Sequence, residues 1–135
     1  MPQVSVNYLA ITVAAIINLI LGFLWYGPLF GRRWTALSNI TPQQMASGGI
    51  AKTTLGSFIV ALIMFYVLSL VVDWTGAKSI GAGAGAGFWM WVGFVGTVMF
   101  NTVLYERRPV ALYVLNTGYF LVSLLIGGAL SAVWA

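Results

Sequence analysis

The apolar positions of the chain gather in four long stretches, which short polar connections separate. The stretches cover residues 4–26, 50–72, 80–105 and 110–134. A transmembrane helix needs about 20 apolar residues to cross a hydrocarbon core of about 30 Å. The pattern therefore predicts an all-α fold, an integral membrane bundle of four transmembrane helices. Because these helices and their connections use the whole chain, we expect a single transmembrane domain over residues 1–135.

The first connection is the longest, and we expect it to hold short interfacial helices. We expect Gly27 and Pro28 to end the first helix, since proline lacks an N–H group and disfavours continuation of a helix. Residues 29–37 combine apolar and basic positions in the way that is typical of a helix lying on a membrane surface. Residues 41–44, Thr-Pro-Gln-Gln, have the capping-box pattern with proline at the first helical position, which predicts a second short helix.

Composition supports the membrane assignment and excludes several classes of protein. The chain is 61% hydrophobic and only 6% charged, and its mean hydropathy is +0.98. Soluble domains carry roughly 25% charged residues. A soluble domain and a disordered protein are therefore excluded. Despite a net charge of +4, we expect no nucleic-acid partner, and the expected partner is the lipid bilayer.

Two residue types are missing from the sequence, and their absence limits the possible chemistry. The chain has no cysteine and no histidine. Disulfides, thiol redox chemistry and the usual ligand sets for zinc, haem and iron–sulfur clusters need one or both of them. The only carboxylates are Asp73 and Glu106. We therefore expect no catalytic residues, no cofactor and no metal site, and we do not expect an enzyme.

The basic residues predict how the chain is oriented. Only Lys78 lies in the second connection, whereas the first and third connections and their edges hold the other five: Arg32, Arg33, Lys52, Arg107 and Arg108. Connections rich in Lys and Arg stay on the cytoplasmic side. We therefore expect a multi-pass protein of the bacterial inner membrane with both termini on the periplasmic, or extracellular, side. The first helix lacks a basic leader and a cleavage site, so we expect it to be retained.

Asparagines inside the apolar stretches are the main candidates for a functional site. Counted from the basic ends of their helices, Asn18, Asn101 and Asn116 lie at a similar depth, about 6–12 Å inside, and Ser57 lies at a comparable depth. One interpretation is a polar pocket or pore vestibule open to the cytoplasm. The other is hydrogen bonding between helices, which contributes about 0.6–2 kcal/mol for each pair.

A glycine repeat opens the third apolar stretch. It is not a phosphate-binding loop, because no Gly-Lys-Ser/Thr follows. Instead it gives two pairs of glycines four residues apart, Gly81 with Gly85 and Gly83 with Gly87. Such spacing lets the backbones of membrane helices approach closely. We expect these glycines to pack helices together, within the bundle or between subunits.

One motif resembles a known family. It combines aromatic residues with glycine and proline at the end of the first apolar stretch, and consists of Trp25, Tyr26, Gly27, Pro28, Gly31 and Trp34. Together with residues 108–125, it resembles the small bacterial membrane proteins grouped as domain of unknown function 1761. The resemblance covers nearly the whole chain. It implies a four-helix inner-membrane protein and carries no established activity.

Two functions fit these observations best. The first is a non-catalytic protein that packs against itself as a homo-oligomer or serves as an accessory subunit of a larger membrane complex. The second is a homo-oligomeric channel or carrier for a small solute, in which the asparagines line the pocket. An enzyme acting on a lipid or quinone is a third alternative.

Overall fold

The computed structural model describes residues 6–38 and 49–134, and within these ranges every regular element is helical. The first helix is α1 (Tyr8–Leu24), which continues into a π-helical turn, η1 (Trp25–Leu29). The short helix α2 (Gly31–Ser38) follows, and α4 (Ile50–Trp74) crosses back. The remaining elements are α5 (Ile80–Trp91), η2 (Val92–Gly96), α6 (Thr97–Met99), α7 (Asn101–Leu104) and α8 (Val110–Val133).

The predicted fold class is confirmed. Within residues 6–38 and 49–134, four helical segments are long and apolar enough to cross a membrane: Tyr8–Leu29, Ala51–Trp74, Ile80–Leu104 and Val110–Val133. Helix α2 falls where the first short helix of the first connection was predicted. The second short helix, predicted from residues 41–44, lies outside the described residues.

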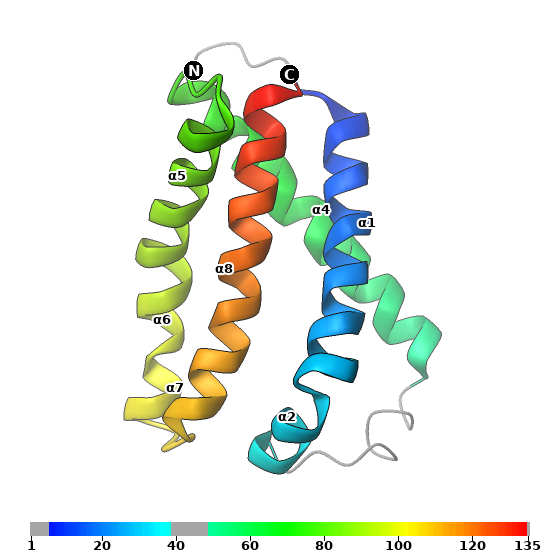
Figure 1. Cartoon of the computed structure of the whole chain (residues 1–135), viewed down its shortest axis with the longest axis vertical. Helices are drawn as coiled ribbons and strands as arrows, with labels where there is room; N and C mark the ends of the chain where they lie inside the picture. Colours follow the sequence, from blue (N-terminus) through cyan, green and yellow to red (C-terminus); the bar gives the residue numbers. More distant parts are fainter. Residues whose placement is uncertain (1–5, 39–48, 135) are drawn as a thin grey trace.

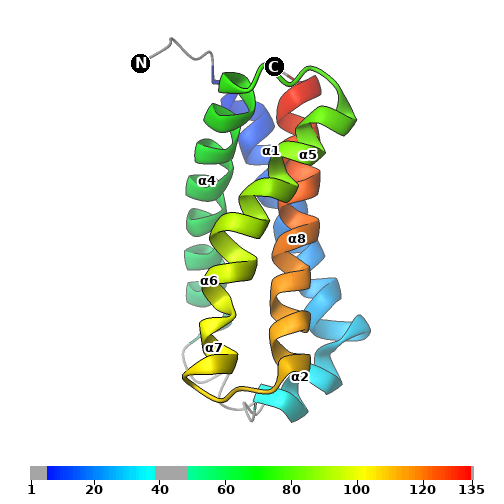
Figure 2. The same cartoon turned by 90° about the vertical axis from the view of Figure 1, so that its left-hand side faces the viewer.

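Helix α8 occupies the middle of the bundle. It packs most extensively against α5 and also contacts α1 and α4. Figure 1 shows α5 and α1 on either side of α8, with α4 crossing obliquely behind. In Figure 2, turned by 90°, α5 stands in front and α4 lies at the left. The first and last helices meet at one end of the bundle, where the Asn7 side-chain amide donates to the Trp134 carbonyl at 3.1 Å. The opposite end holds α2 and the connection between α7 and α8.

Glycines bring α5 and α8 into backbone contact. A Cβ atom placed on Gly83 or Gly87 would overlap the backbone of α8 at Gly128 or Leu124. A Cβ atom on Gly85 would meet nothing within 4 Å. Half of the glycine repeat therefore faces α8, and the other half faces away from it.

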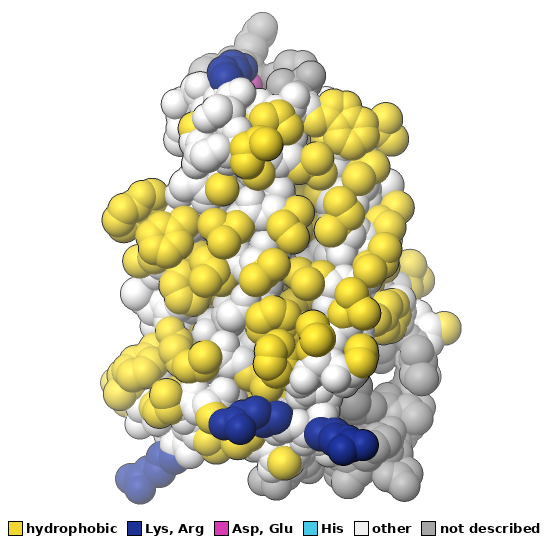
Figure 3. All heavy atoms as spheres, in the orientation of Figure 1, with side chains coloured by type: hydrophobic (Ala, Val, Ile, Leu, Met, Phe, Trp, Pro, Cys, Tyr) yellow, Lys and Arg dark blue, Asp and Glu magenta, His cyan; other side chains and the backbone are white. Residues whose placement is uncertain are grey.

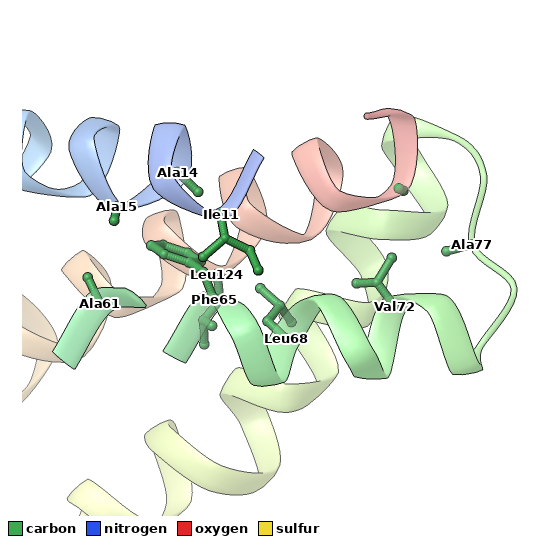
Figure 4. Packing of buried hydrophobic residues seen from close by; sticks show 10 residues of the cluster. Ile11, Ala14, Ala15, Ala61, Phe65, Leu68, Val72, Ala77 and Leu124 are labelled. Atoms are coloured by element: carbon green, nitrogen blue, oxygen red, sulfur yellow. The ribbon is translucent and has the colours of Figure 1, made fainter. Parts of the chain in front are cut away.

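The apolar core lies mainly between α1, α4 and α8 (Figure 4). Phe65 of α4 is 2% exposed and Ala15 of α1 is fully buried, and Leu124 of α8 belongs to the same cluster. Small residues at this crossing leave room for the Phe65 ring, since a Cβ atom on Gly127 would clash with it.

Large apolar side chains also cover the outside of the helices. Leu9, Phe23 and Ile63 are each about 60% exposed. Figure 3 shows such side chains over the middle of one face, with Lys and Arg side chains at the two ends. An apolar band between charged ends matches a bilayer core between its two interfaces. The chain is therefore an integral membrane protein by its fold and its surface. We call the end that carries Arg32, Arg33, Arg107 and Arg108 the basic end.

Candidate functional site

The aromatic Gly-Pro motif forms a π-helical turn at the basic end of the first transmembrane segment. The Phe30 N–H group donates to the Trp25 carbonyl, five residues back, at 2.9 Å. Pro28 lies inside this turn, where its missing N–H group would interrupt a regular α-helix. A Cβ atom on Gly31 would lie 2.6 Å from the Tyr26 carbonyl oxygen, so only glycine lets the chain fold back into α2 this tightly. Single π-helical turns within α-helices often occur at functional sites.

Trp25 anchors this turn on α8. Its indole N–H group donates to the Leu115 carbonyl at 3.0 Å. A Cβ atom on Gly118 would lie 3.3 Å from the indole ring, so glycine at this position allows the ring to rest against α8. The ring of Phe30 packs against Trp25 with 4.8 Å between ring centroids.

Tyr26, the next residue of η1, joins η1 to α2 and α8. Its hydroxyl donates to the side-chain oxygen of Asn116 at 2.9 Å. Its ring makes edge contacts with Tyr119 of α8 and Trp34 of α2, with centroids 5.4 and 5.5 Å apart. The motif therefore fixes α1, α2 and α8 together at the basic end.

These side chains form one wall of a cavity of about 400 Å³ between α1, α4 and α8, which we call the aromatic cleft. The polar groups that line it are uncharged and come mainly from α4 and α8. Its lining consists of Leu19, Gly22, Phe23, Tyr26, Trp34, Thr53, Thr54, Ser57, Asn116 and Tyr119.

A second, smaller cavity of about 270 Å³ adjoins the aromatic cleft at the basic end. Trp34 and Asn116 line both cavities. The smaller one also contains the charged side chains of Glu106 and Arg108. Asn116 therefore stands between an uncharged cavity and a charged one.

The structure brings only two of the four candidate pocket residues together. Ser57 and Asn116 line the aromatic cleft. Asn18 is 6% exposed, and its side-chain oxygen accepts a hydrogen bond from the Ser123 hydroxyl at 2.5 Å, which closes the seam between α1 and α8. Asn101 lies on an exposed face of α7 and lines neither cavity. The prediction that all four residues share one pocket is therefore wrong for Asn18 and Asn101. They lie at a similar depth, but their side chains point in different directions around the helices.

This placement predicts that replacing asparagine by leucine changes the stability of the protein differently at Asn18 and at Asn101. Asn18→Leu removes the partner of Ser123 in a buried seam and should lower stability by about 0.6–2 kcal/mol. Asn101→Leu replaces an exposed amide on a membrane-facing helix and should leave stability unchanged or raise it. Thermal unfolding of the two variants in the same detergent tests this. Equal destabilisation by both would contradict the assignment.

Sequence reasoning missed three aromatic residues whose hydrogen bonds join α8 to its neighbours. The Trp91 indole N–H group donates to the Thr117 carbonyl at 2.8 Å. The Tyr113 hydroxyl donates to the carbonyl of Gly96, the last residue of η2, at 2.5 Å. Tyr119, whose hydroxyl donates to the Asn18 carbonyl, was missed as well. The available signal was that Tyr and Trp in mid-membrane need a hydrogen-bond partner.

The two carboxylates cannot act as a pair. Asp73 lies near the end of α4, close to Asn7 and Trp134, where the two chain ends meet. Glu106 lies at the basic end, beside Arg108. Within the described residues there is no group of three acidic side chains that could hold a metal ion.

The fold and the aromatic cleft define a class: a small integral membrane protein with four membrane-spanning helices and an uncharged cavity at one end. The family described as Protein of unknown function (DUF1761) matches residues 9–131. The chain belongs to this family, which confirms the resemblance seen in its aromatic Gly-Pro motif. No curated protein and no solved structure matches the chain.

Proposed function

We propose that this chain is a non-catalytic membrane protein that binds a small, uncharged amphiphile in the aromatic cleft. The observation that carries the proposal is the lining of that cleft. Aromatic rings and aliphatic side chains make its walls, and a few uncharged hydrogen-bonding groups lie among them. Ligand sites are typically cavities of about 300–1,000 Å³ with this kind of lining, and the cleft lies within that range.

The polar groups of the cleft suit a head group that hydrogen-bonds without carrying charge. Asn116 uses its side-chain oxygen to accept from Tyr26, which leaves its amide N–H groups as donors. Thr53 and Ser57 line the cleft with hydroxyls that have no hydrogen-bond partner in the part of the chain that the structure describes. A charged head group would find no counter-ion among these residues and would lose its hydration.

Access from the bilayer supports an amphiphile rather than a water-soluble solute. Phe23, Thr53 and Ser57 line the cleft and are exposed on the outside of the bundle. In a membrane, this exposed side faces lipid. A ligand with an apolar body can enter sideways and place its polar head near Asn116.

Head-group competition tests the proposal. We expect a photoreactive long-chain alcohol to label the protein saturably in lipid vesicles. An unlabelled alcohol of the same length should displace it, and the alkyl sulfate and alkyl ammonium of that length should not. Displacement by all three alike would show partition into lipid and would contradict a site for uncharged heads.

Cellular orientation follows from the basic end. We propose that this end faces the cytoplasm of a bacterial inner membrane, with both chain ends on the other side. Because the chain has no cysteine, single cysteines report topology without background. Ala36→Cys should resist an impermeant thiol reagent in intact cells, and Ser79→Cys should react. The reverse pattern would invert the orientation.

Self-assembly is a second candidate, and the outer edge of α5 favours it. A Cβ atom on Gly81 or Gly85 would meet nothing within 4 Å, so this edge can approach another helix closely. The double variant Gly81→Leu, Gly85→Leu should then shift a homo-oligomer to monomer in native mass spectrometry. An unchanged distribution of oligomers would show that the subunits do not associate through this edge of α5.

A further inference from the structure

A third cavity, of about 430 Å³, lies on the side of η1 that faces away from the aromatic cleft. Trp25 and Phe30 form one wall, and α8 forms the other. Among the described residues, its lining is Trp25, Phe30, Arg33, Ala111, Val114, Leu115 and Gly118. We call it the Arg33 groove, because Arg33 is the one charged residue among the described residues that line it.

The groove runs from the interface into the apolar part of the bundle. Its α8 wall extends from Ala111 to Gly118, a rise of about 10 Å along the helix. Arg33 belongs to α2, which lies at the basic end (Figure 1). The groove is therefore apolar along its length and positively charged at its interfacial end.

The surrounding charge is positive as well. Arg32, Arg33, Arg107 and Arg108 gather at the basic end, and within the described residues none of them forms an ion pair. Their guanidinium groups remain available to an outside anion. Arginine beside a membrane surface binds phosphate through strong, charge-assisted hydrogen bonds.

We infer that the Arg33 groove holds one anionic phospholipid of the surrounding leaflet. Its phosphate would pair with Arg33, and part of an acyl chain would lie along Val114 and Gly118. Charge and depth together favour this occupant, since a phospholipid places an anion at the interface and a hydrocarbon chain directly beneath it. Trp25 is held against α8 by its hydrogen bond to Leu115, so the apolar wall is already formed.

This site is separate from the aromatic cleft. The neighbours Trp25 and Tyr26 line the groove and the cleft respectively, and the two cavities share no lining residue. The groove carries a cation and the cleft carries none, so the two are expected to bind different classes of lipid-like molecule.

Native mass spectrometry from mixed micelles of phosphatidylglycerol and phosphatidylcholine tests the inference. The wild-type protein should retain one phosphatidylglycerol in preference to phosphatidylcholine. Arg33→Gln should reduce the retained phosphatidylglycerol about fivefold, the effect of one arginine near a membrane surface. Arg32→Gln, its neighbour outside the groove, should have little effect. Both are exposed positions of α2, so folding should persist in each variant.

A second pair of variants tests the acyl-chain part of the groove. Val114→Trp fills it, and Val60→Trp is the control on α4; the two valines are 59% and 64% exposed. We expect only Val114→Trp to reduce phosphatidylglycerol retention.

Two results would overturn the site. Equal losses of phosphatidylglycerol in Arg33→Gln and Arg32→Gln would show a general effect of charge. Displacement of the lipid by inorganic phosphate would overturn it too, since a free anion would then be the occupant.

Discussion

Gly87→Ala is expected to destabilise the bundle by about 1–3 kcal/mol, whereas Gly85→Ala should leave it as stable or make it slightly more so. The added Cβ atom at Gly87 would overlap the Leu124 carbonyl of α8, and a helix backbone cannot move aside locally. At Gly85 the same atom would meet nothing within 4 Å. Alanine there should also favour the helix by up to about 1 kcal/mol relative to glycine.

The measurement is the apparent midpoint of thermal unfolding, followed by circular dichroism in one detergent. Only Gly87→Ala should lower it, and by several degrees. The two positions are two residues apart in the same repeat, so the substitution and its depth in the membrane are closely matched, and the contact with α8 differs. Similar midpoints for both variants would show that α5 does not pack on α8 through this face.

Ser57→Phe is expected to abolish saturable labelling by the photoreactive long-chain alcohol. The serine lines the aromatic cleft from α4 and is itself exposed, so a phenyl ring can extend into the cavity without displacing the core. Leu55→Phe is the matched control, since Leu55 is 60% exposed on the same helix and does not line the cleft.

Both variants add a phenylalanine to the same apolar stretch and should insert and fold equally well. Labelling should therefore be lost in Ser57→Phe and preserved in Leu55→Phe, with equal unfolding midpoints. Loss of labelling in both, or preservation in both, would place the alcohol somewhere other than the aromatic cleft.

The glycine repeat shows how much the sequence could predict. Its spacing indicates close packing, but Gly81 with Gly85 and Gly83 with Gly87 have the same spacing, and both pairs alternate with alanine. Which pair meets α8 depends on the rotation of α5 about its axis, and that rotation is set by contacts with α8 that no local pattern contains. In the structure, Gly83 and Gly87 make the contact.

The asparagines show the same limit at the candidate site. Counting residues from the helix ends gives depth, and depth alone suggested that Asn18, Asn101 and Asn116 face one pocket. The direction of each side chain depends on how the helices turn toward one another. Asn18 faces Ser123 and Asn101 faces outward, so Asn116 remains as the asparagine of the aromatic cleft.

The aromatic Gly-Pro motif was recognisable in the sequence, but its partner on α8 was not. The prediction that Gly27 and Pro28 end the first helix is wrong, because the helix continues through them as a π-helical turn to Leu29. That turn directs Tyr26 toward Asn116 and Tyr119, about 90 residues away in the chain. Contacts over such a separation cannot be derived from spacing within a motif.

The most direct test of the central proposal is to map where the photoreactive long-chain alcohol attaches in the wild-type protein, by mass spectrometry of peptides from lipid vesicles. We predict attachment at the walls of the aromatic cleft, at Tyr26, Trp34 and Ser57, and its disappearance when excess unlabelled alcohol is present. Attachment spread along the exposed apolar faces, unchanged by the competitor, would contradict a binding site in the cleft.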